Sequence, residues 1–335
     1  MSNAKKQRVV FIGSGGIAER HITALRAIGD VDVVGVAARS LEAASGFATR
    51  HAVKPFGDYR SMLDETKPDA AFLCVTPGAH GEIERAVIER RVPFFVEKPL
   101  AIDWETAASL AKEVERAGLV TGVGYHFRYL STAEQAKEIL GSRHVGLALG
   151  YWLTTTPPPA WWSQRAMSGG QTIEQMTHIF DLARWLVGEI TSVYGVAARV
   201  PRTVEGGGGA KSLRGDVDEV HATTVTFASG AVGSFNSTHV LKTSYRVGLH
   251  LFAEDLAIEV GAAGVVVDDG RTRTEHRVVG DPTQKEDRAF LDAVRKGDPS
   301  GIRSTYADAL RTHRVTTLVV ESARTGAPIE IAEPA

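Results

Sequence analysis

The chain has 335 residues, of which 38 are basic and 40 acidic, with a formal net charge of −2 and one cysteine. This length exceeds the size at which a single hydrophobic core stops growing, so the sequence predicts two domains. The balanced charge, without a long basic run, gives no indication of binding to nucleic acid or an anionic membrane, and no apolar run approaches the roughly 20 residues that span a bilayer. Cys74 has no partner for an internal disulfide and lies in an apolar stretch, which favours a buried structural thiol and a cytoplasmic protein.

The first expected strand, residues 8–12, runs directly into the sequence GSGGIA and then into a segment with helical spacing of apolar side chains. A G-x-G-x-x-A motif between strand and helix is typical of dinucleotide binding. Gly13 would permit the tight turn, Gly15 would let the backbone approach a pyrophosphate, and Ala18 would let helix and strand pack closely. The residues predicted to bind the dinucleotide here are Gly13, Ser14, Gly15, Gly16, Ile17 and Ala18.

The second expected strand, residues 31–37, predicts which dinucleotide is bound. Its end, where the adenosine ribose should lie, reads Ala38-Arg39-Ser40, without the Asp or Glu that usually holds the 2′-hydroxyl of NAD. Arg39 can fork onto a 2′-phosphate, and Ser40 can add a hydroxyl and cap the next helix. The sequence therefore favours NADP over NAD. The alternative is that Arg39 is a solvated side chain and the protein accepts both.

Strands and helices alternate through residue 123, which predicts a parallel, doubly wound sheet. The expected helices cover residues 41–50, 59–65, 82–90 and 104–117, and the expected strands lie near Val53 and at 70–75, 92–96 and 119–123. Thr76 and Pro77 follow the strand at 70–75, and His80 opens the next helix. His80 either touches the nicotinamide ribose or caps that helix, and both readings stay open.

Glu97-Lys98-Pro99 directly follows the apolar run 92–96. Ligands of open α/β sheets bind outside the carboxyl ends of the strands, so a lysine at this edge points at a ligand. The alternative is a weak surface salt bridge between Glu97 and Lys98.

Longer alternating segments follow residue 124 and predict a mainly antiparallel sheet. They cover residues 147–155, 217–227, 231–240 and 245–252, with a helix near 171–186 and two more at the C-terminus. The sequence thus predicts an α/β protein with two domains. Residues 1–124 form a Rossmann domain, and residues 125–335 form an α/β domain with a large open sheet for substrate binding and oligomerisation. Glycines 206–209 predict a mobile loop.

If residues 172–186 form one helix, Glu174, His178 and Asp181 stand at i, i+4 and i+7 on one face. An imidazole flanked by acids is oriented, and its protonated form is stabilised, as a general base requires. An amphipathic helix with a salt-linked polar face is one alternative. A metal site is another, although two carboxylates and one histidine lack a further ligand cluster, so no metal is predicted.

The motifs GSGGIA, VTPGAH, EKPLA and GGQTIEQMTHIFDLARWLVG, in this order and spacing, resemble those of the glucose-fructose oxidoreductase, inositol dehydrogenase and MocA family. The resemblance covers nearly the whole chain. It implies an NAD(P)-dependent oxidoreductase that needs no metal, whose second domain closes the cofactor cleft and commonly mediates homo-oligomers, here a dimer or tetramer. The family's lysine and histidine fall on Lys98 and His178. Its aspartate is replaced by Glu174, and a glycine by Met176, so the pocket is expected to be reshaped.

The predicted reaction moves a hydride between the nicotinamide and a secondary alcohol or ketone of a sugar, cyclitol or related polyol. Lys98 would hydrogen-bond the developing alkoxide, His178 would take the proton, Asp181 would orient the imidazole, and Glu174 would contact substrate or Lys98. The remaining cofactor-binding candidates are Thr76, Pro77, His80 and Glu97. The substrate-binding candidates are Tyr125, His126, Arg128, Trp161, Trp162 and Arg165, the two indoles by stacking on a ring or, alternatively, by packing at an interface.

Two other classes remain open at this point. One is a catalytically silent NADP-binding sensor or partner protein, which the departures at Glu174 and Met176 make conceivable. The other is a hydrolase or lyase that uses a tightly bound cofactor for transient oxidation.

Overall fold

The computed structural model describes residues 6–200 and 215–332, and the predicted loop at 206–209 lies outside them. The chain divides into two compact units. Unit 1 takes Met1–Ala101, Glu105–Tyr129 and Asp281–Leu310, and unit 2 takes Ile102–Trp104, Leu130–Gly280 and Arg311–Ala335. The division predicted at residue 124 therefore missed the return of residues 281–310 to unit 1.

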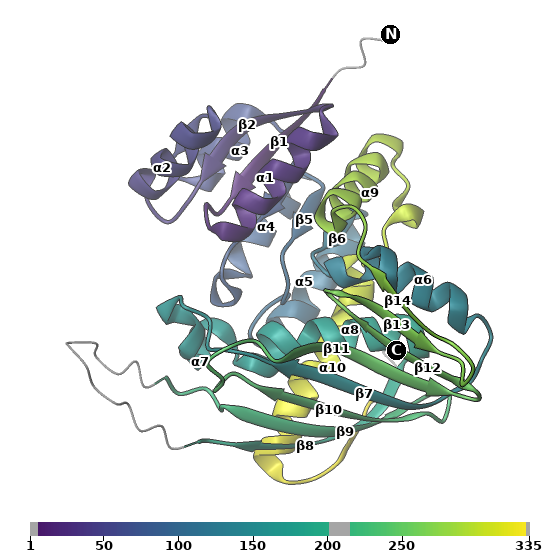
Figure 1. Ribbon diagram of the computed structural model, residues 1–335. Helices are drawn as coiled ribbons and strands as arrows, with labels where there is room; N and C mark the ends of the chain where they lie inside the picture. The colour runs from purple at the N-terminus through teal and green to yellow at the C-terminus, as the bar shows by residue number, and fades with distance from the viewer. Residues whose placement is uncertain (1–5, 201–214, 333–335) are drawn as a thin grey trace. The chain divides into compact units, whose positions relative to one another are not determined.

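Unit 1 is built on a six-stranded sheet of order β3-β2-β1-β4-β5-β6, in which every pair is parallel (Figure 1). The strands are β1 (Gln7–Ile12), β2 (Val31–Ala37), β3 (Pro55–Phe56), β4 (Ala70–Leu73), β5 (Phe94–Val96) and β6 (Thr121–Val123). The helices are α1 (Gly16–Ile28), α2 (Leu41–His51), α3 (Tyr59–Thr66), α4 (Glu82–Glu89), α5 (Trp104–Ala117) and α9 (Pro282–Lys296). The predicted doubly wound parallel sheet is confirmed.

An aromatic ladder on one face of this sheet explains why α9 belongs to unit 1. Phe11, Phe72 and Phe95 stand opposite one another on β1, β4 and β5, with ring centroids 5.3 and 5.4 Å apart. Phe290 of α9 packs edge-on against Phe72 and Phe95 at 5.6 and 5.7 Å. All four rings are buried, so α9 covers apolar surface that the N-terminal helices leave open. Cys74 is buried after β4, in line with a structural thiol.

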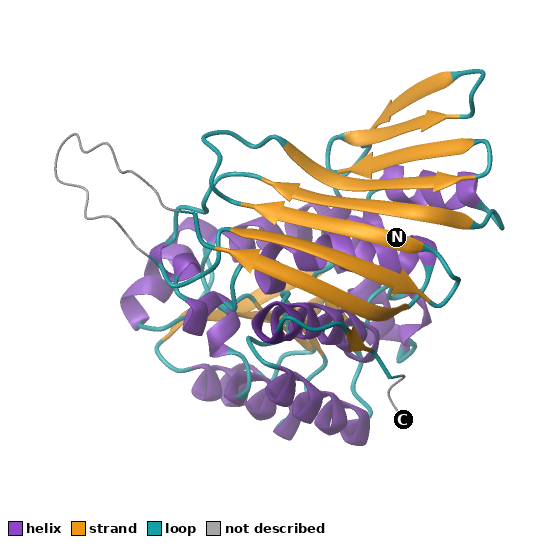
Figure 2. Cartoon of the chain, turned by 90° about the horizontal axis from the view of Figure 1, so that it is seen from below, coloured by secondary structure: helices purple, strands orange, loops and turns teal. Residues whose placement is uncertain are grey.

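Unit 2 contains a nine-stranded sheet of order β14-β13-β12-β11-β7-β10-β9-β8-β15, shown in orange in Figure 2. Every pair is antiparallel except β7 with β10, which confirms the prediction of a mainly antiparallel sheet. The strands are β7 (Val145–Leu153), β8 (Ile190–Ala198), β9 (Val220–Phe227), β10 (Val232–Thr238), β11 (Arg246–Ala253), β12 (Leu256–Gly261), β13 (Gly264–Asp268), β14 (Arg273–Arg277) and β15 (Ile329–Glu330). The helices are α6 (Ser131–Leu140), α7 (Arg165–Ser168) and α8 (Thr177–Val187), together with α10 (Tyr306–Thr325) from Arg311 onward, since its first turn belongs to unit 1.

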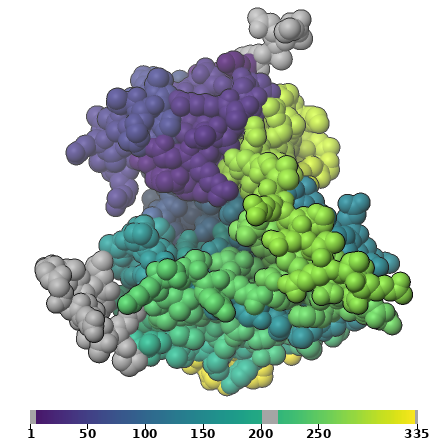
Figure 3. All heavy atoms as spheres, viewed as in Figure 1, coloured from purple at the N-terminus to yellow at the C-terminus, as the bar shows by residue number. Residues whose placement is uncertain are grey.

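The two faces of this sheet differ in how far they are covered. Phe180 of α8 stacks on Phe235 of β10 with centroids 4.7 Å apart, so α8 packs on the face that carries Phe235. On the opposite face, Val232, Leu147 and Phe252 are lateral neighbours on β10, β7 and β11, and each is more than a third exposed. The green atoms of this sheet's strands reach the surface of unit 2 in Figure 3. Among the described residues, no helix has the length and apolarity needed to cross a bilayer.

Candidate active site

The glycine loop lies at the carboxyl end of β1, between that strand and α1. Gly13 has φ +108°, and a Cβ there would lie 2.0 Å from the backbone oxygen of Cys74, so this turn accepts only glycine. Gly15 is the N-cap residue of α1 and supplies no side-chain cap, which leaves the first N–H groups of the helix to a ligand. A Cβ on Gly15 or Gly16 would meet no atom within 4 Å. The loop therefore fits a pyrophosphate at the helix N-terminus.

The end of β2 carries the predicted specificity residues. Arg39 and Ser40 are exposed, and the Ser40 hydroxyl accepts a hydrogen bond from the Ala43 N–H at 3.2 Å, so Ser40 caps α2. At the other end of the strand, Asp30 pairs with Arg288 at 3.0 Å and with Arg295 at 2.8 Å. Asp30 is thus used within unit 1 to hold α9, and Arg39 is the charged side chain at the edge where the ribose is expected.

His80 and its neighbours form the turn after β4. A 3₁₀ turn spans Pro77–Ala79, and the His80 Nδ1 lies 2.5 Å from Glu84 Oε1. The other oxygen of Glu84 accepts a hydrogen bond from the Gly81 N–H at 2.6 Å. Both side chains are fully buried. Glu84, rather than His80, therefore caps α4, and His80 is oriented by the carboxylate.

Glu97 and Lys98 follow β5, as predicted. The Glu97 side chain is buried, and its Oε1 lies 3.0 Å from His21 Nε2, while His21 Nδ1 lies 2.8 Å from Asp287 Oδ1. Gly124 packs against the same carboxylate, since a Cβ there would lie 2.3 Å from Glu97 Oε1. The alternative of a weak surface salt bridge between Glu97 and Lys98 is wrong for Glu97, because this side chain lies in a buried ionic cluster.

The electrostatics of this cluster follow from burial and pairing. Burial acts to lower the pKa of His21, but the charge of Asp287 and hydrogen bonds to Asp287 and Glu97 outweigh it and raise that pKa well above the ordinary value. Burial acts to raise the pKa of Glu97, but the hydrogen bond and charge of His21 lower it. Burial raises the pKa of Glu286 well above its ordinary value. The shifts therefore favour the protonated form of His21, the charged form of Glu97 and the protonated form of Glu286.

The cluster residues His21, Asp287 and Glu286 were not predicted as part of the site. One signal was available for His21, which recurs with the apolar side chains on the inward face of α1 and is completely buried. Glu286 and Asp287 are buried on α9, more than 260 residues later in the chain than His21. Sequence spacing cannot place them beside β5.

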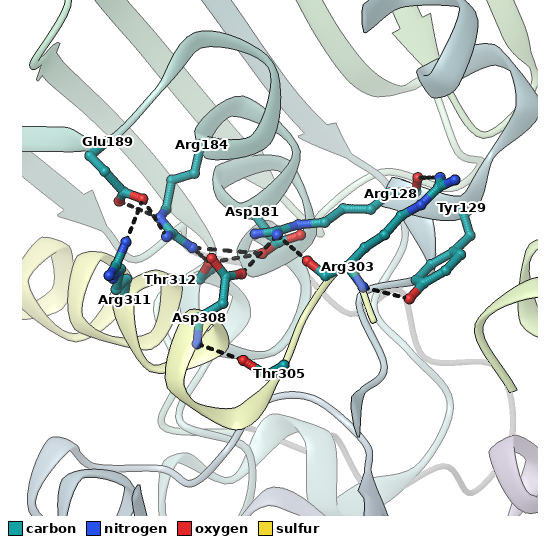
Figure 4. Close-up of polar contacts among 10 residues, drawn as sticks. All are labelled: Arg128, Tyr129, Asp181, Arg184, Glu189, Arg303, Thr305, Asp308, Arg311 and Thr312. Carbon is teal, nitrogen blue, oxygen red and sulfur yellow. Dashed lines mark hydrogen bonds and ion pairs between the residues drawn. The ribbon is translucent and has the colours of Figure 1, made fainter. Parts of the chain in front are cut away.

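The segment after β6 corrects one prediction. Arg128 was expected to meet the substrate, but its guanidinium is buried, donates to the Arg303 carbonyl at 2.5 Å and pairs with Asp308 at 2.7 Å (Figure 4). These contacts make Arg128 an internal structural residue of unit 1. Tyr125 is fully buried. Burial, followed by the charge of Arg20, lowers the pKa of His126 to about 3, so the imidazole of His126 is neutral.

In unit 2 the predicted helix is divided. Thr172–Met176 forms a π-helical turn and α8 begins at Thr177, so Glu174 and His178 are not related by regular α-helical spacing. Glu174 Oε2 accepts a hydrogen bond from the Trp162 indole N–H at 2.7 Å. His178 is buried and its ring stacks on Trp152, with centroids 5.6 Å apart and planes 17° from parallel.

Asp181 was predicted to orient His178, but its described contacts are different. Its Oδ1 accepts a hydrogen bond from the Thr312 hydroxyl at 2.9 Å and lies 4.0 Å from Arg184, as drawn in Figure 4. Arg184 in turn pairs with Glu189 at 2.7 Å. The contact between Asp181 and Thr312 joins α8 to α10. The role of Asp181 toward His178 stays a prediction.

The proline-rich loop separates its two tryptophans. Trp162 is buried and meets His239 edge-on at 4.7 Å, whereas Trp161 is partly exposed. The hydroxyl of Thr156 lies 3.0 Å from His239 Nδ1. Arg165 pairs with Asp218 at 2.7 Å. Trp162 therefore holds Glu174 by a hydrogen bond, and Trp161 is the more exposed of the two indoles.

Comparisons with known proteins agree with this geometry. Residues 7–125 match the family described as "Oxidoreductase family, NAD-binding Rossmann fold", and residues 135–260 match the "GFO/IDH/MocA C-terminal domain". The levoglucosan dehydrogenase of Pseudarthrobacter phenanthrenivorans is 27% identical over 70% of this chain and 63% of its own length. The myo-inositol 2-dehydrogenase of Thermotoga maritima is 23% identical over 88% of this chain and 90% of its own.

The fold is likewise similar to a solved structure. A levoglucosan dehydrogenase in complex with NADH superposes with a TM-score of 0.86 at 21% identity, covering 98% of this chain and 100% of that one. With both family domains matched in order, the chain belongs to the GFO/IDH/MocA family of NAD-binding oxidoreductases, whose members include NAD-dependent sugar and cyclitol dehydrogenases.

Proposed function

We propose that this protein is a dehydrogenase or reductase that uses a nicotinamide dinucleotide and a secondary alcohol or ketone of a sugar, cyclitol or related polyol. The observation that carries the proposal is the uncapped N-terminus of α1 behind a turn that admits only glycine, within an NAD-binding family domain. The substrate class is supported by the relatives named as levoglucosan and inositol dehydrogenases.

Several groups of unit 1 would hold the cofactor. The N–H groups at the start of α1 bind the pyrophosphate, and the residues in this loop are Gly13, Ser14, Gly15, Gly16, Ile17 and Ala18. Thr76, Pro77, His80 and Glu97 flank its nicotinamide half. Arg39 and Ser40 meet the adenosine ribose, and the exposed guanidinium of Arg39 favours the 2′-phosphate of NADP. When bound, the nicotinamide ring accepts or donates the hydride.

Lys98 and His178 would share the acid–base work. Lys98 donates a hydrogen bond to the oxygen that becomes negative as the alcohol is oxidised, and His178 removes the hydroxyl proton. Glu174, oriented by Trp162, accepts a hydrogen bond from a substrate hydroxyl. Asp181 orients the imidazole, and the stack on Trp152 further limits the rotation of the His178 ring.

The substrate itself would lie against aromatic and polar groups. The accessible indole of Trp161 suits the flat face of a pyranose or cyclitol ring, and Tyr125, His126, Trp162 and Arg165 complete the candidate set. Assembly into a homodimer or homotetramer stays a prediction, supported by the exposed apolar side chains on the open face of the unit 2 sheet. Size-exclusion chromatography with light scattering tests it.

Two experiments test the function. Thermal melting with NAD and with NADP should show a stabilisation that is larger for NADP. A panel of sugars, cyclitols and their ketones is then tested, and the change in cofactor absorbance at about 340 nm is measured for each compound. Stabilisation without turnover of any panel member would favour a silent cofactor-binding protein, and absence of both would overturn the proposal. Net substrate conversion without a change in bulk cofactor would instead identify the hydrolase or lyase class.

A further inference from the structure

Glu97, the residue that precedes Lys98, belongs to a buried ionic cluster in unit 1 together with His21, Asp287 and Glu286. We propose that His21 is a positioning residue: its protonated ring binds Glu97 on one side and Asp287 on the other, and so fixes the chain segment that carries Lys98. This inference rests on the proposed function of Lys98 and adds a residue that does not touch the substrate.

The geometry shows that both ring nitrogens of His21 are used. Nε2 lies 3.0 Å from Glu97 Oε1 and Nδ1 lies 2.8 Å from Asp287 Oδ1, and the His21 side chain is completely buried. The ring also packs against Phe95 and Phe72 at 5.1 and 5.6 Å. Aromatic packing and two charge-assisted hydrogen bonds therefore determine the position of the imidazole, and the imidazole determines that of Glu97.

The contact between His21 and Glu97 matters for Lys98 because the charges of His21 and Lys98 both act on Glu97. A buried carboxylate without a counter-charge is strongly disfavoured. Against the effect of burial, the groups that lower the pKa of Glu97 are His21 first, then Lys98 and His126. The acids Glu286 and Asp287 face the same cluster, with Arg20 and His126 nearby. Without the charge of His21, Glu97 would either bind a proton or draw on the Lys98 ammonium. Both outcomes would change the environment of Lys98.

The cluster also connects Lys98 to the dinucleotide loop. His21 lies on α1, which begins at Gly16, directly after the glycine turn. The end of β5 and α9 supply its two carboxylates. One rigid helix thus carries both the candidate pyrophosphate site and the group that holds Glu97, so placement of the cofactor and of Lys98 depend on the same element.

A bound metal ion is the rival explanation of the cluster. His21, Glu97 and Glu286 offer ligand atoms that all lie within 4.8 Å of one another, and Glu286 Oε2 is buried without a hydrogen-bond partner. A direct hydrogen bond between His21 and Glu97, with a raised pKa of Glu286 that favours its protonated form, accounts for the same arrangement without an ion. The experiment below separates the two.

The test compares His21→Phe, which keeps the ring but removes both hydrogen bonds, with His21→Gln, which keeps one donor. The matched control is Gln7→Leu, because Gln7 is also buried and also ties the sheet to α9, through a 3.1 Å hydrogen bond to the Leu291 carbonyl. Acylation of Lys98 by an amine-reactive reagent is followed across pH by peptide mass spectrometry. This measurement needs no substrate.

We expect His21→Phe to change the rate of Lys98 acylation at least about threefold and to shift its pH dependence, with a smaller change in His21→Gln. Gln7→Leu should lower the melting temperature without altering Lys98 acylation. Equal changes in His21→Phe and Gln7→Leu would mean that His21 is merely structural and would overturn the proposal. So would unchanged acylation in His21→Phe.

Two further measurements complete the design. If metal analysis of the wild-type protein finds about one divalent ion per chain, and removing it with a chelator reproduces the His21→Phe effect, His21 is a metal ligand and the proposal fails. If the wild type neither binds a nicotinamide cofactor nor turns over a polyol while His21→Phe still changes Lys98 selectively, the positioning role holds and the proposed function fails. With an active enzyme, His21→Phe should lower kcat about tenfold or more with cofactor affinity nearly unchanged.

Discussion

Both units contain a buried histidine next to residues of the candidate site, but the surroundings of the two rings differ. In unit 1, His21 lies between two carboxylates that are 76 and 266 residues away in sequence. In unit 2, His178 stacks on Trp152, and the nearby Glu174 accepts a hydrogen bond from an indole. The two carboxylates raise the pKa of His21 well above its ordinary value and so favour its protonated form, which is unsuited to a general base. The neighbours of a histidine thus decide how strongly its protonated form is stabilised.

The strongest test of this contrast replaces the histidine of unit 2. His178→Ala should lower kcat by about 10²–10⁴-fold, because it removes the general base, while cofactor affinity stays nearly unchanged. Steady-state kinetics and cofactor titration measure the two effects. A comparable loss of both would contradict the assignment. Loss of activity only through unfolding is excluded by the melting temperature of the variant.

The predicted preference for NADP is tested by reversing the charge of Arg39 in unit 1. Arg39→Asp should lower kcat/KM for NADP by about 10–100-fold, because an aspartate repels the 2′-phosphate and can accept a hydrogen bond from the 2′-hydroxyl of NAD. The value for NAD should stay level or rise. Arg116→Asp is the control, since Arg116 is an exposed arginine in the last turn of α5 and lies outside the proposed cofactor residues, so its reversal should leave both values unchanged. Equal effects on NAD and NADP would contradict the prediction.

The hydrogen bond from the Trp162 indole to Glu174 positions the carboxylate that is proposed to contact the substrate. Trp162→Phe keeps an aromatic ring but removes the N–H donor, leaving Glu174 without a 2.7 Å hydrogen bond. A hydrogen bond to a charged group contributes about 1.5–3 kcal/mol, so kcat/KM should fall roughly 10–100-fold. Glu174→Asp, which restores the residue expected from the family pattern, tests whether the longer side chain matches Trp162. Unchanged kinetics in Trp162→Phe would show that Glu174 is positioned by other groups.

The pH dependence of stability tests one buried histidine in each unit, His126 and His221, whose pKa values are lowered. Burial lowers the pKa of His126 in unit 1 to about 3 and that of His221 in unit 2 to about 4, from 6.5. Below pH 6.5 the unfolded chain binds protons that the folded chain excludes, so stability should fall as pH falls, by about 1.4 kcal/mol per pH unit for each histidine. Denaturant unfolding at several pH values measures this slope. His221→Gln should reduce this slope by about 1.4 kcal/mol per pH unit. An unchanged slope would contradict the lowered pKa of His221.

The smallest effect is expected at Glu286. Because burial raises the pKa of Glu286 well above its ordinary 4.5, the folded chain holds a proton there that the unfolded chain loses as pH rises. Glu286→Gln mimics the neutral acid and should therefore stabilise the fold by about 1 kcal/mol at alkaline pH, with less gain near pH 5. Denaturant unfolding at the two pH values measures the difference. Destabilisation at both would show that the carboxylate form is needed.

The elements of unit 1 and the local part of the site were predictable from the sequence. The strand, glycine turn and helix of residues 7–28 are encoded by neighbouring residues, since only glycine accepts the turn at Gly13. The apolar run before Glu97 likewise identified β5 and the position of Lys98 at its end. Strands β12–β14 were not predicted, because sheet pairing is non-local and β14 is exposed on both faces.

Only the tertiary structure decided which side chains meet. It placed α9 on the aromatic ladder of the first sheet and thereby brought Asp287 to His21, a contact between residues 266 positions apart that no local pattern specifies. It also turned Arg128 into an internal ion pair and drew Asp181 to Thr312, although the sequence had suggested a role at the site for both. The physical reason is that secondary structure follows local periodicity, whereas the partner of a buried charge is set by how distant segments pack around it.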